Sequence, residues 1–298
     1  MAAAHGQPMS SPPPSLHATF PTNPRNAPMD IERGLVRTDL GHIHYRAAGI
    51  GAPVMLFHIN QQSSALMREL IQALAPDFRV VAMDYPSHGH SDPIDFQPSF
   101  ADYTACAIAV MDALGIQKAS VMGEAVGAGV SVAIANTHPD RVEKVVLINC
   151  PFSPERGRTA VHVTELQSGL RPEDASGFPL TRDLAFLRDR DPGHSPMYPT
   201  QDWMDRINTA QIEAGRNRWQ AVTALANFDM NDGLTRLAQP TLLLLGEHFH
   251  YVKHIEDMRA RIRNLRDAVL PNGRFCMSWE RATEIAEIAR PFLLEPST

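Results

Sequence analysis

The sequence predicts an α/β fold in which helices flank a mostly parallel central sheet and a helical cap is inserted into the chain. Short apolar runs bounded by Gly, Pro, Asp or Asn recur along it, as strands buried on both faces do. Segments with helical periodicity lie between these runs, and strands that alternate with helices form parallel sheets with right-handed crossovers. The alternation stops once, between residues 153 and 233, which indicates an insertion.

The elements follow in order. Leu35–Thr38 and Ile43–Ala48 flank a turn at Leu40-Gly41 and predict a hairpin. The buried strands expected after it are Val54–His58, Val80–Asp84, Ser120–Met122, Val145–Ile148, Thr241–Leu245 and Ala268–Leu270. The helices expected between them are Ala65–Leu74, Tyr103–Leu114, Val126–Thr137, Ile255–Leu265 and Thr283–Leu293.

The pattern divides the chain into three regions. Residues 1–30 are rich in proline and predict a disordered tail, because they cannot bury enough apolar surface to become ordered. Residues 31–152 and 233–298 form the predicted core. Residues 153–232 form the predicted helical cap, in which Asp202–Phe228 carries apolar side chains at helical spacing. An insertion between two strands of one sheet is expected over the carboxyl ends of the strands, where open α/β sheets bind ligands.

Charge and hydropathy argue against several classes of partner. The 27 Lys and Arg residues against 33 Asp and Glu give a net charge of −6, without the basic surplus that nucleic acids or anionic lipids attract. The longest apolar stretch is far shorter than the roughly 20 residues of a bilayer span, and the first 30 residues lack the features of a secretory signal. We expect a cytoplasmic protein whose partner is a small molecule, with no nucleic acid and no membrane, and leave a homodimer open.

No metal and no cofactor is predicted. The three cysteines are too widely spaced for a disulfide framework or a zinc cluster. The histidines at 248, 250 and 254 do not have a recurrent ligand spacing, and no acidic pair completes them. The glycines at 123, 127 and 129 lack the phase of a dinucleotide-binding loop.

Residues 121–129 read Val-Met-Gly-Glu-Ala-Val-Gly-Ala-Gly, a strand that enters a helix through glycines around a central residue. The nucleophile elbow, G-x-S-x-G, has this spacing because its tight turn leaves no room for a Cβ atom at the glycines. Together with segments 54–58, 84–92, 243–247 and 271–281, it makes residues 34–295 resemble the α/β-hydrolase fold superfamily. The resemblance implies that fold and a site at the elbow.

The positions that carry the catalytic triad in this superfamily are apolar here. The central residue of the elbow is Ala125, which has no atom able to attack a substrate. The acid is expected three residues after Gly246, at Phe249, and the base histidine five residues before Glu280, at Phe275. Ser-His-Asp acyl transfer needs nucleophile, base and orienting acid within hydrogen-bond reach. The sequence therefore predicts a degenerate triad.

Two ionisable side chains remain beside the elbow as candidate catalytic residues, Glu124 and His58. A carboxyl group beside an apolar floor would have a raised pKa, as a general acid needs, although a hydrogen bond to backbone or an arginine would make it structural. His58 closes its strand and could equally order the oxyanion loop. Ile59 follows it where the superfamily often has Gly, so its Cβ crowds the backbone N–H donor.

The remaining residues of the predicted pocket and oxyanion region are Val126, Asn149 and Cys150. Asn149 and Cys150 end a strand at the place where some members of the superfamily carry a relocated acid. Asn cannot serve as that acid, and Cys150 would need a base to become a thiolate, with His58 the candidate.

Three functions follow, the first favoured narrowly. A non-hydrolytic enzyme of lyase, isomerase or cyclase type would confine a small apolar molecule for cyclisation, isomerisation, decarboxylation or elimination. The resemblance implies this, because members of the superfamily that lost the serine have turned to such chemistry. A pseudoenzyme would bind a small molecule or a protein partner without turnover. A hydrolase with displaced groups would use Glu124 or Cys150 assisted by His58.

Overall fold

The computed structural model describes residues 29–152, 154, 174–182 and 200–296, and the structural statements that follow concern these residues. Most of the predicted tail, residues 1–30, and much of the predicted cap, residues 153–232, lie outside them. The division into tail, core and cap therefore stays a prediction.

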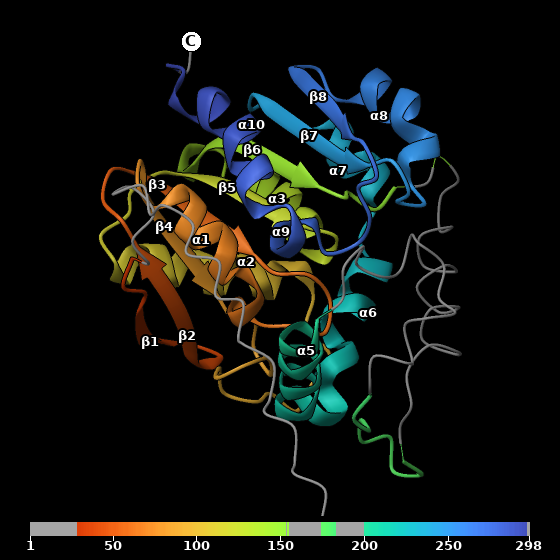
Figure 1. Ribbon diagram of the computed structural model, residues 1–298. Coiled ribbons are helices and arrows are strands. Elements are labelled where there is room, and N and C mark those ends of the chain that lie inside the picture. Colours follow the sequence, from red (N-terminus) through yellow and green to blue (C-terminus); the bar gives the residue numbers. More distant parts are fainter. Residues whose placement is uncertain (1–28, 153, 155–173, 183–199, 297–298) are drawn as a thin grey trace, which may run out of the picture.

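An eight-stranded sheet forms the centre of the molecule, in the order β1-β2-β4-β3-β5-β6-β7-β8 (Figure 1). Its strands are β1 (Glu32–Thr38), β2 (Gly41–Ala48), β3 (Ala52–Phe57), β4 (Phe78–Met83), β5 (Ala119–Glu124), β6 (Val142–Ile148), β7 (Thr241–Gly246) and β8 (Leu265–Leu270). The first hairpin and the β2–β4 pair are antiparallel, and the remaining pairs are parallel. The prediction of a mostly parallel sheet with a leading hairpin is confirmed.

Helices cover both faces of the sheet (Figure 1). One face carries α1 (Arg68–Leu74), α9 (Met277–Glu280) and α10 (Ala282–Leu294). The other carries α2 (Phe100–Ala113), α3 (Val126–Thr137), α7 (Met230–Thr235) and α8 (Ile255–Arg261). Shorter 3₁₀ turns are η2 (Ser64–Met67), η3 (Pro139–Arg141) and η7 (Val252–His254).

Neighbouring residues of the central strands pack into different layers. Val145 and Leu147 of β6 join the cluster on the α2–α3 side, whereas Val146 and Ile148 join the cluster on the α1–α10 side. Side chains alternate between the faces of a strand, so a strand covered on both faces needs an uninterrupted apolar run. This is the physical reason why such runs identified the strands in the sequence.

Between β6 and β7 the chain forms α5 (Gln201–Ala214), η6 (Gly215–Trp219) and α6 (Gln220–Ala226). The Oγ1 atom of Thr200 accepts a hydrogen bond from the N–H of Trp203 at 3.1 Å and caps α5. Trp203, Met204 and Ile207 of α5 then pack in one buried cluster with Ala125, at the end of β5. This helix therefore covers the junction between β5 and α3.

The predicted helix Ile255–Leu265 is too long. Helix α8 ends at Arg261, and Ile262 already has an extended backbone. The C=O of Asn264 accepts a hydrogen bond from the N–H of Thr241, which draws the segment into pairing with β7. Within the described ranges, no helix combines the length and apolar character needed to cross a membrane.

Candidate active site

The turn between β5 and α3 holds Ala125 in an uncommon backbone conformation. Its φ of 53° and ψ of −111° lie where a residue with a side chain is strained. Its N–H donates to the C=O of Ile148 at 3.0 Å. A Cβ atom on Gly123 would overlap the backbone of Gly127, and one on Gly127 would overlap the C=O of Phe57. The glycines thus maintain a sharp turn that presents only a methyl group.

Helix α3 begins directly at this turn. The C=O of Ala125 accepts from the N–H groups of Ala128 at 3.0 Å and Gly129 at 3.3 Å. The N–H groups of Val126 and Gly127 precede these first helical bonds and have no partner inside the helix. They lie at the positive end of the helix dipole. Such donors are suited to a carbonyl oxygen or an oxyanion.

Two aromatic rings lie beside the turn. Phe249, after β7, and Phe275, after β8, stack with ring centroids 6.4 Å apart and planes at 12°. Phe275 also packs against the buried cluster that contains Ala125, and Ile59 belongs to the same cluster. The structure thus brings the three positions predicted to have lost the triad to one apolar region.

Glu124, the last residue of β5, is fully buried and its carboxylate oxygens are occupied. Oε1 accepts from Asn149 Nδ2 at 3.0 Å and from the N–H of Met277 at 2.9 Å. Oε2 accepts from the N–H and the hydroxyl of Ser278, at 2.9 and 2.5 Å. Burial raises the pKa of Glu124, although these hydrogen bonds oppose the rise. The carboxyl group joins β5 to the start of α9.

Asn149 connects β5, the end of β7 and the loop after β8 through hydrogen bonds of its side chain. Its Nδ2 donates to Glu124 and to the C=O of Arg274, the latter at 2.8 Å. Its Oδ1 accepts from the N–H of Gly246 at 3.0 Å. Asn149 therefore holds the end of β7 and the loop that carries Phe275, a role its amide fills better than a carboxylate because it donates and accepts.

His58 is fully buried after β3, and both of its ring nitrogens make hydrogen bonds. Nδ1 donates to the C=O of Ile59 at 2.8 Å, and Nε2 accepts from the N–H of Tyr85 at 3.3 Å. Burial, reinforced by His88, lowers the pKa of His58 to about 3. The imidazole is neutral near pH 7 and orders the loop after β3.

Cys150 is also fully buried, and its thiol donates to the C=O of Pro151 at 3.7 Å. Burial raises the pKa of Cys150 to about 12. Only a thiolate attacks a substrate readily, so this cysteine is unreactive near neutral pH. The nitrogen atoms of His58 are already engaged and offer it no free base.

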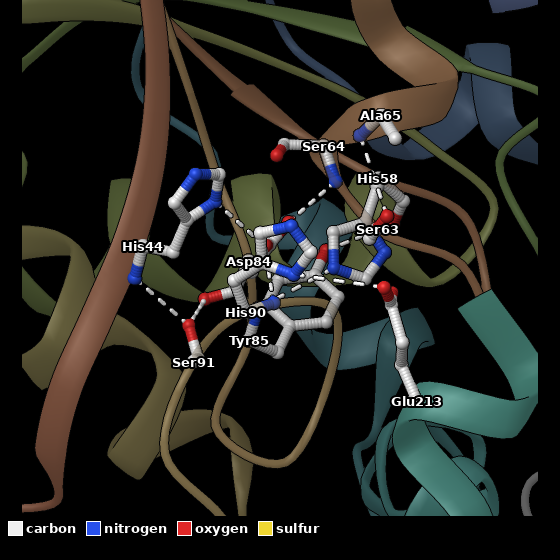
Figure 2. Close-up of polar contacts among 10 residues, drawn as sticks. All are labelled: His44, His58, Ser63, Ser64, Ala65, Asp84, Tyr85, His90, Ser91 and Glu213. Atoms are coloured by element: carbon white, nitrogen blue, oxygen red, sulfur yellow. Dashed lines mark hydrogen bonds and ion pairs between the residues drawn. The ribbon is translucent and has the colours of Figure 1, made fainter. Parts of the chain in front are cut away.

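Asp84 directly follows β4 and accepts hydrogen bonds from several segments around it (Figure 2). Its carboxylate accepts from the His44 ring at 2.8 Å and from the N–H groups of Ser64 and His90 at 2.5 and 3.0 Å. Burial alone would raise the pKa of Asp84, but these hydrogen bonds and nearby His58 hold it at about 2. This buried anion ties β2 to the loop after β3.

Two buried polar side chains lie in the loop after β3 and on α5, and the sequence analysis missed the first of them, Gln61, as a ligand contact. Both amide atoms of Gln61, in the loop after β3, lack a hydrogen-bond partner, as does Nε1 of Trp203 on α5. Buried polar groups are usually paired with protein or ordered water. Only the position of Gln61 after a buried strand could have drawn attention to it. In the part of the chain that the structure describes, no group of three or more side chains is arranged to hold a metal ion.

Comparison with known proteins agrees with this architecture. The family model described as alpha/beta hydrolase fold matches residues 52–282. A Pseudomonas putida protein named 2-hydroxy-6-oxononadienedioate/2-hydroxy-6-oxononatrienedioate hydrolase 2 is 36% identical over 277 residues, covering 84% of this chain and 91% of its own. Haloalkane dehalogenase 2 of Mycobacterium tuberculosis is 38% identical over 115 residues, covering 38% of this chain and only 40% of its own length.

Solved structures show the same fold at lower identity. An enol-lactonase from Burkholderia xenovorans has a TM-score of 0.68 at 22% identity and covers 88% of this chain and 100% of its own. The epoxide hydrolase CorEH has a TM-score of 0.70 at 18% identity and covers 88% of this chain and 98% of its own. Similarity at this level describes the fold.

Proposed function

Because the chain belongs to the α/β-hydrolase fold family, we propose that it acts on a small organic molecule at the β5–α3 turn without forming a covalent intermediate. The observation that carries this proposal is Ala125. The chain keeps a strained elbow, with the glycines that the turn requires, yet presents a methyl group where a nucleophile would attack. In this interpretation Ala125, Phe249 and Phe275 are a degenerate triad, and the reaction is a cyclisation, isomerisation, decarboxylation or elimination.

The surroundings of Ala125 support such chemistry. The N–H groups of Val126 and Gly127 can polarise a carbonyl oxygen or stabilise an enolate, and an apolar site strengthens that interaction. The unpaired amide of Gln61 and the indole N–H of Trp203 can orient a polar group of the substrate. Because the polar atoms of Glu124 and His58 are engaged within the protein, we propose them as positioning residues rather than proton carriers.

Hydrolysis is the second candidate, and the relatives favour it. One is named as a hydrolase of a hydroxy-oxo-dienedioate or -trienedioate, and the other as a haloalkane dehalogenase. The displaced nucleophiles this would require are Glu124 or Cys150 with His58 as base. Their burial and hydrogen bonds weigh against that role, so hydrolysis here would require a water molecule activated by other groups.

The first test is to identify the molecule that the protein carries. Protein purified from its own host would be examined by native mass spectrometry, and the 2-hydroxy-6-oxononadienedioate named for the relative would serve as probe in solution. A product of unchanged mass, or one that has lost carbon dioxide or an eliminated small molecule, supports the proposal. Cleavage with gain of one water supports hydrolysis, and binding without conversion identifies a pseudoenzyme.

Two matched variants connect the result to the site. Trp203→Phe keeps an aromatic ring but removes the unpaired indole N–H, and we expect weaker binding of a polar substrate. Trp219→Phe makes the same change outside the cluster around Ala125 and should bind as the parent does. Equal binding by both variants would show that the indole N–H of Trp203 does not contact the ligand.

A cytoplasmic location and association with a small molecule, with a homodimer as a further alternative, complete the proposal. Size-exclusion chromatography with light scattering measures the oligomeric state directly.

A further inference from the structure

A cavity of about 310 Å³, lined mostly by polar residues, lies beside α5, and we call it the α5 cavity. Core residues line it from one side, among them Arg46 of β2, Ser63 before η2 and His90 after β4. The α5 residues that line it include Arg206, Thr209 and Glu213. Figure 2 shows Glu213 extending from α5 toward His90. Its volume is at the lower end of the range for small-molecule sites.

The α5 cavity is separate from the apolar cluster at the turn. Trp203, Met204 and Ile207 face that cluster with Ala125, whereas other residues of the same helix line the cavity. Both sites therefore contact α5, but through different residues of that helix.

Arg46 is the unusual group in the cavity. Its guanidinium makes no hydrogen bond or ion pair with the residues that the structure describes, and its Nε atom is buried without a partner. Burial lowers the pKa of Arg46, and the positive charges of Arg33 and Arg68 lower it further. The negative charges of Asp84 and Glu213 oppose this shift. A half-buried cation without a partner is costly, because desolvation is not offset by hydrogen bonds.

The acidic groups around the cavity have other partners. Asp84 already accepts from His44, Ser64 and His90. Glu213 lies 3.6 Å from the His90 ring, and Arg206 pairs with Glu69 at 3.0 Å. Arg46 is thus left as the cation for an incoming group.

We propose that the α5 cavity binds a small monocarboxylate whose carboxylate pairs with Arg46. A guanidinium matches a carboxylate in a bidentate arrangement. Ser63 and Thr209 supply hydroxyl donors on opposite walls, and the Ser63 oxygen accepts only from the N–H of Ala65. Asp84, Asp205 and Glu213 border the same space, and they repel a doubly charged phosphate more strongly than a monocarboxylate.

Binding there has a consequence for α5. A carboxylate held by Arg46 on β2 and by Thr209 on α5 joins this helix to the core. Because α5 packs over Ala125, a ligand in the α5 cavity stabilises the position of this helix over the turn. The proposal does not depend on the reaction at the turn, because Arg46 lines the α5 cavity and Ala125 does not.

Titration calorimetry of the full chain with benzoate, benzamide and inorganic phosphate tests the site. We expect benzoate to bind, with benzamide and phosphate at least about tenfold weaker. Amide hydrogen exchange in α5 should slow with benzoate and stay unchanged with benzamide. Equal binding of benzoate and benzamide, or no benzoate binding at about 10 mM, would overturn the proposal.

Variants assign the binding to Arg46. Arg46→Gln should weaken benzoate binding about tenfold or more, whereas Arg37→Gln, on the exposed β1 strand, should leave it unchanged. Glu213→Gln removes a negative charge from the cavity and should tighten binding, which gives an independent measurement if Arg46→Gln does not fold. Unchanged affinity in both Arg46→Gln and Glu213→Gln would exclude the α5 cavity as the site.

Discussion

The rings of Phe249 and Phe275 stack with nearly parallel planes and centroids 6.4 Å apart, although 26 positions separate them in the sequence. They follow neighbouring parallel strands, β7 and β8, whose carboxyl ends lie at one edge of the sheet. The chain thus has an aromatic pair in the region where the resemblance places an acid and a base. An apolar pair leaves no buried charge without a partner, and the first two predictions depend on this.

Restoring the nucleophile alone should not restore hydrolysis. We expect neither the parent nor Ala125→Ser to turn over p-nitrophenyl acetate or to be labelled by a fluorophosphonate, because Phe249 and Phe275 cannot accept a proton. Mass spectrometry after labelling and absorbance assays measure both properties. Stoichiometric labelling of the parent would contradict the non-covalent proposal, and labelling of Ala125→Ser alone would reveal another base.

Introducing an acid at Phe249 should destabilise the fold. Phe249 is 3% exposed, so Phe249→Asp would bury a carboxylate against Phe275 without a partner. We expect Phe249→Leu to lower the free energy of unfolding by about 1 kcal/mol and Phe249→Asp by about 3 kcal/mol or more. Urea unfolding followed by circular dichroism compares the two. Equal stability would mean that a polar group satisfies the new carboxylate.

The sheet could be predicted from the sequence because burial on both faces leaves a local signal. Each predicted run, such as Val145–Ile148, lies inside an observed strand or overlaps it, and the glycines around Ala125 located the turn. The end of α8 was missed because Asn264 is drawn into pairing with Thr241, a contact between segments far apart in sequence. Local periodicity carries no information about such a contact.

The polar connections of the site could not be read from the sequence for the same reason. Glu124 was identified beside the turn, but its partners Asn149 and Ser278 lie 25 and 154 positions away. Arg46 of the first hairpin and Glu213 of α5 line the same cavity, and no sequence motif contains both residues. Hydrogen bonds across the fold depend on packing that only the assembled structure reveals.

Glu124→Gln tests whether the carboxylate is a structural anchor. An amide would direct a donor at the N–H or hydroxyl of Ser278 and leave at least one buried group unpaired. We expect a loss of about 1–3 kcal/mol in the free energy of unfolding. Glu256→Gln, on the exposed side of α8, is the matched control and should change stability by less than about 0.5 kcal/mol. A fully stable Glu124→Gln that lost turnover would instead support a proton-transfer role.

The thiols should be inert in the native protein. Cys106, Cys150 and Cys276 are buried thiols, and burial raises the pKa of Cys106 and Cys150 to about 11 and about 12. We expect no reaction with iodoacetamide at pH 8 until urea unfolds the chain, after which all three thiols are alkylated. Intact mass measurements before and after unfolding count the modified sites. Rapid alkylation of native Cys150 would restore the hypothesis of a displaced nucleophile.

Asp84 should make the fold sensitive to acid. The folded pKa of about 2 lies below the ordinary value of 3.8, because the His44 ring and the N–H groups of Ser64 and His90 donate to the ionised carboxylate. A depressed folded pKa stabilises the protein above pH 3.8, and this contribution disappears as the pH falls from there toward 2. The shift corresponds to about 2 kcal/mol. We therefore expect the parent to be more stable than Asp84→Asn at pH 7, and the difference to shrink as the pH approaches 3. Urea unfolding of both proteins at several pH values measures this difference, and a constant difference would mean that Asp84 contributes through packing rather than charge.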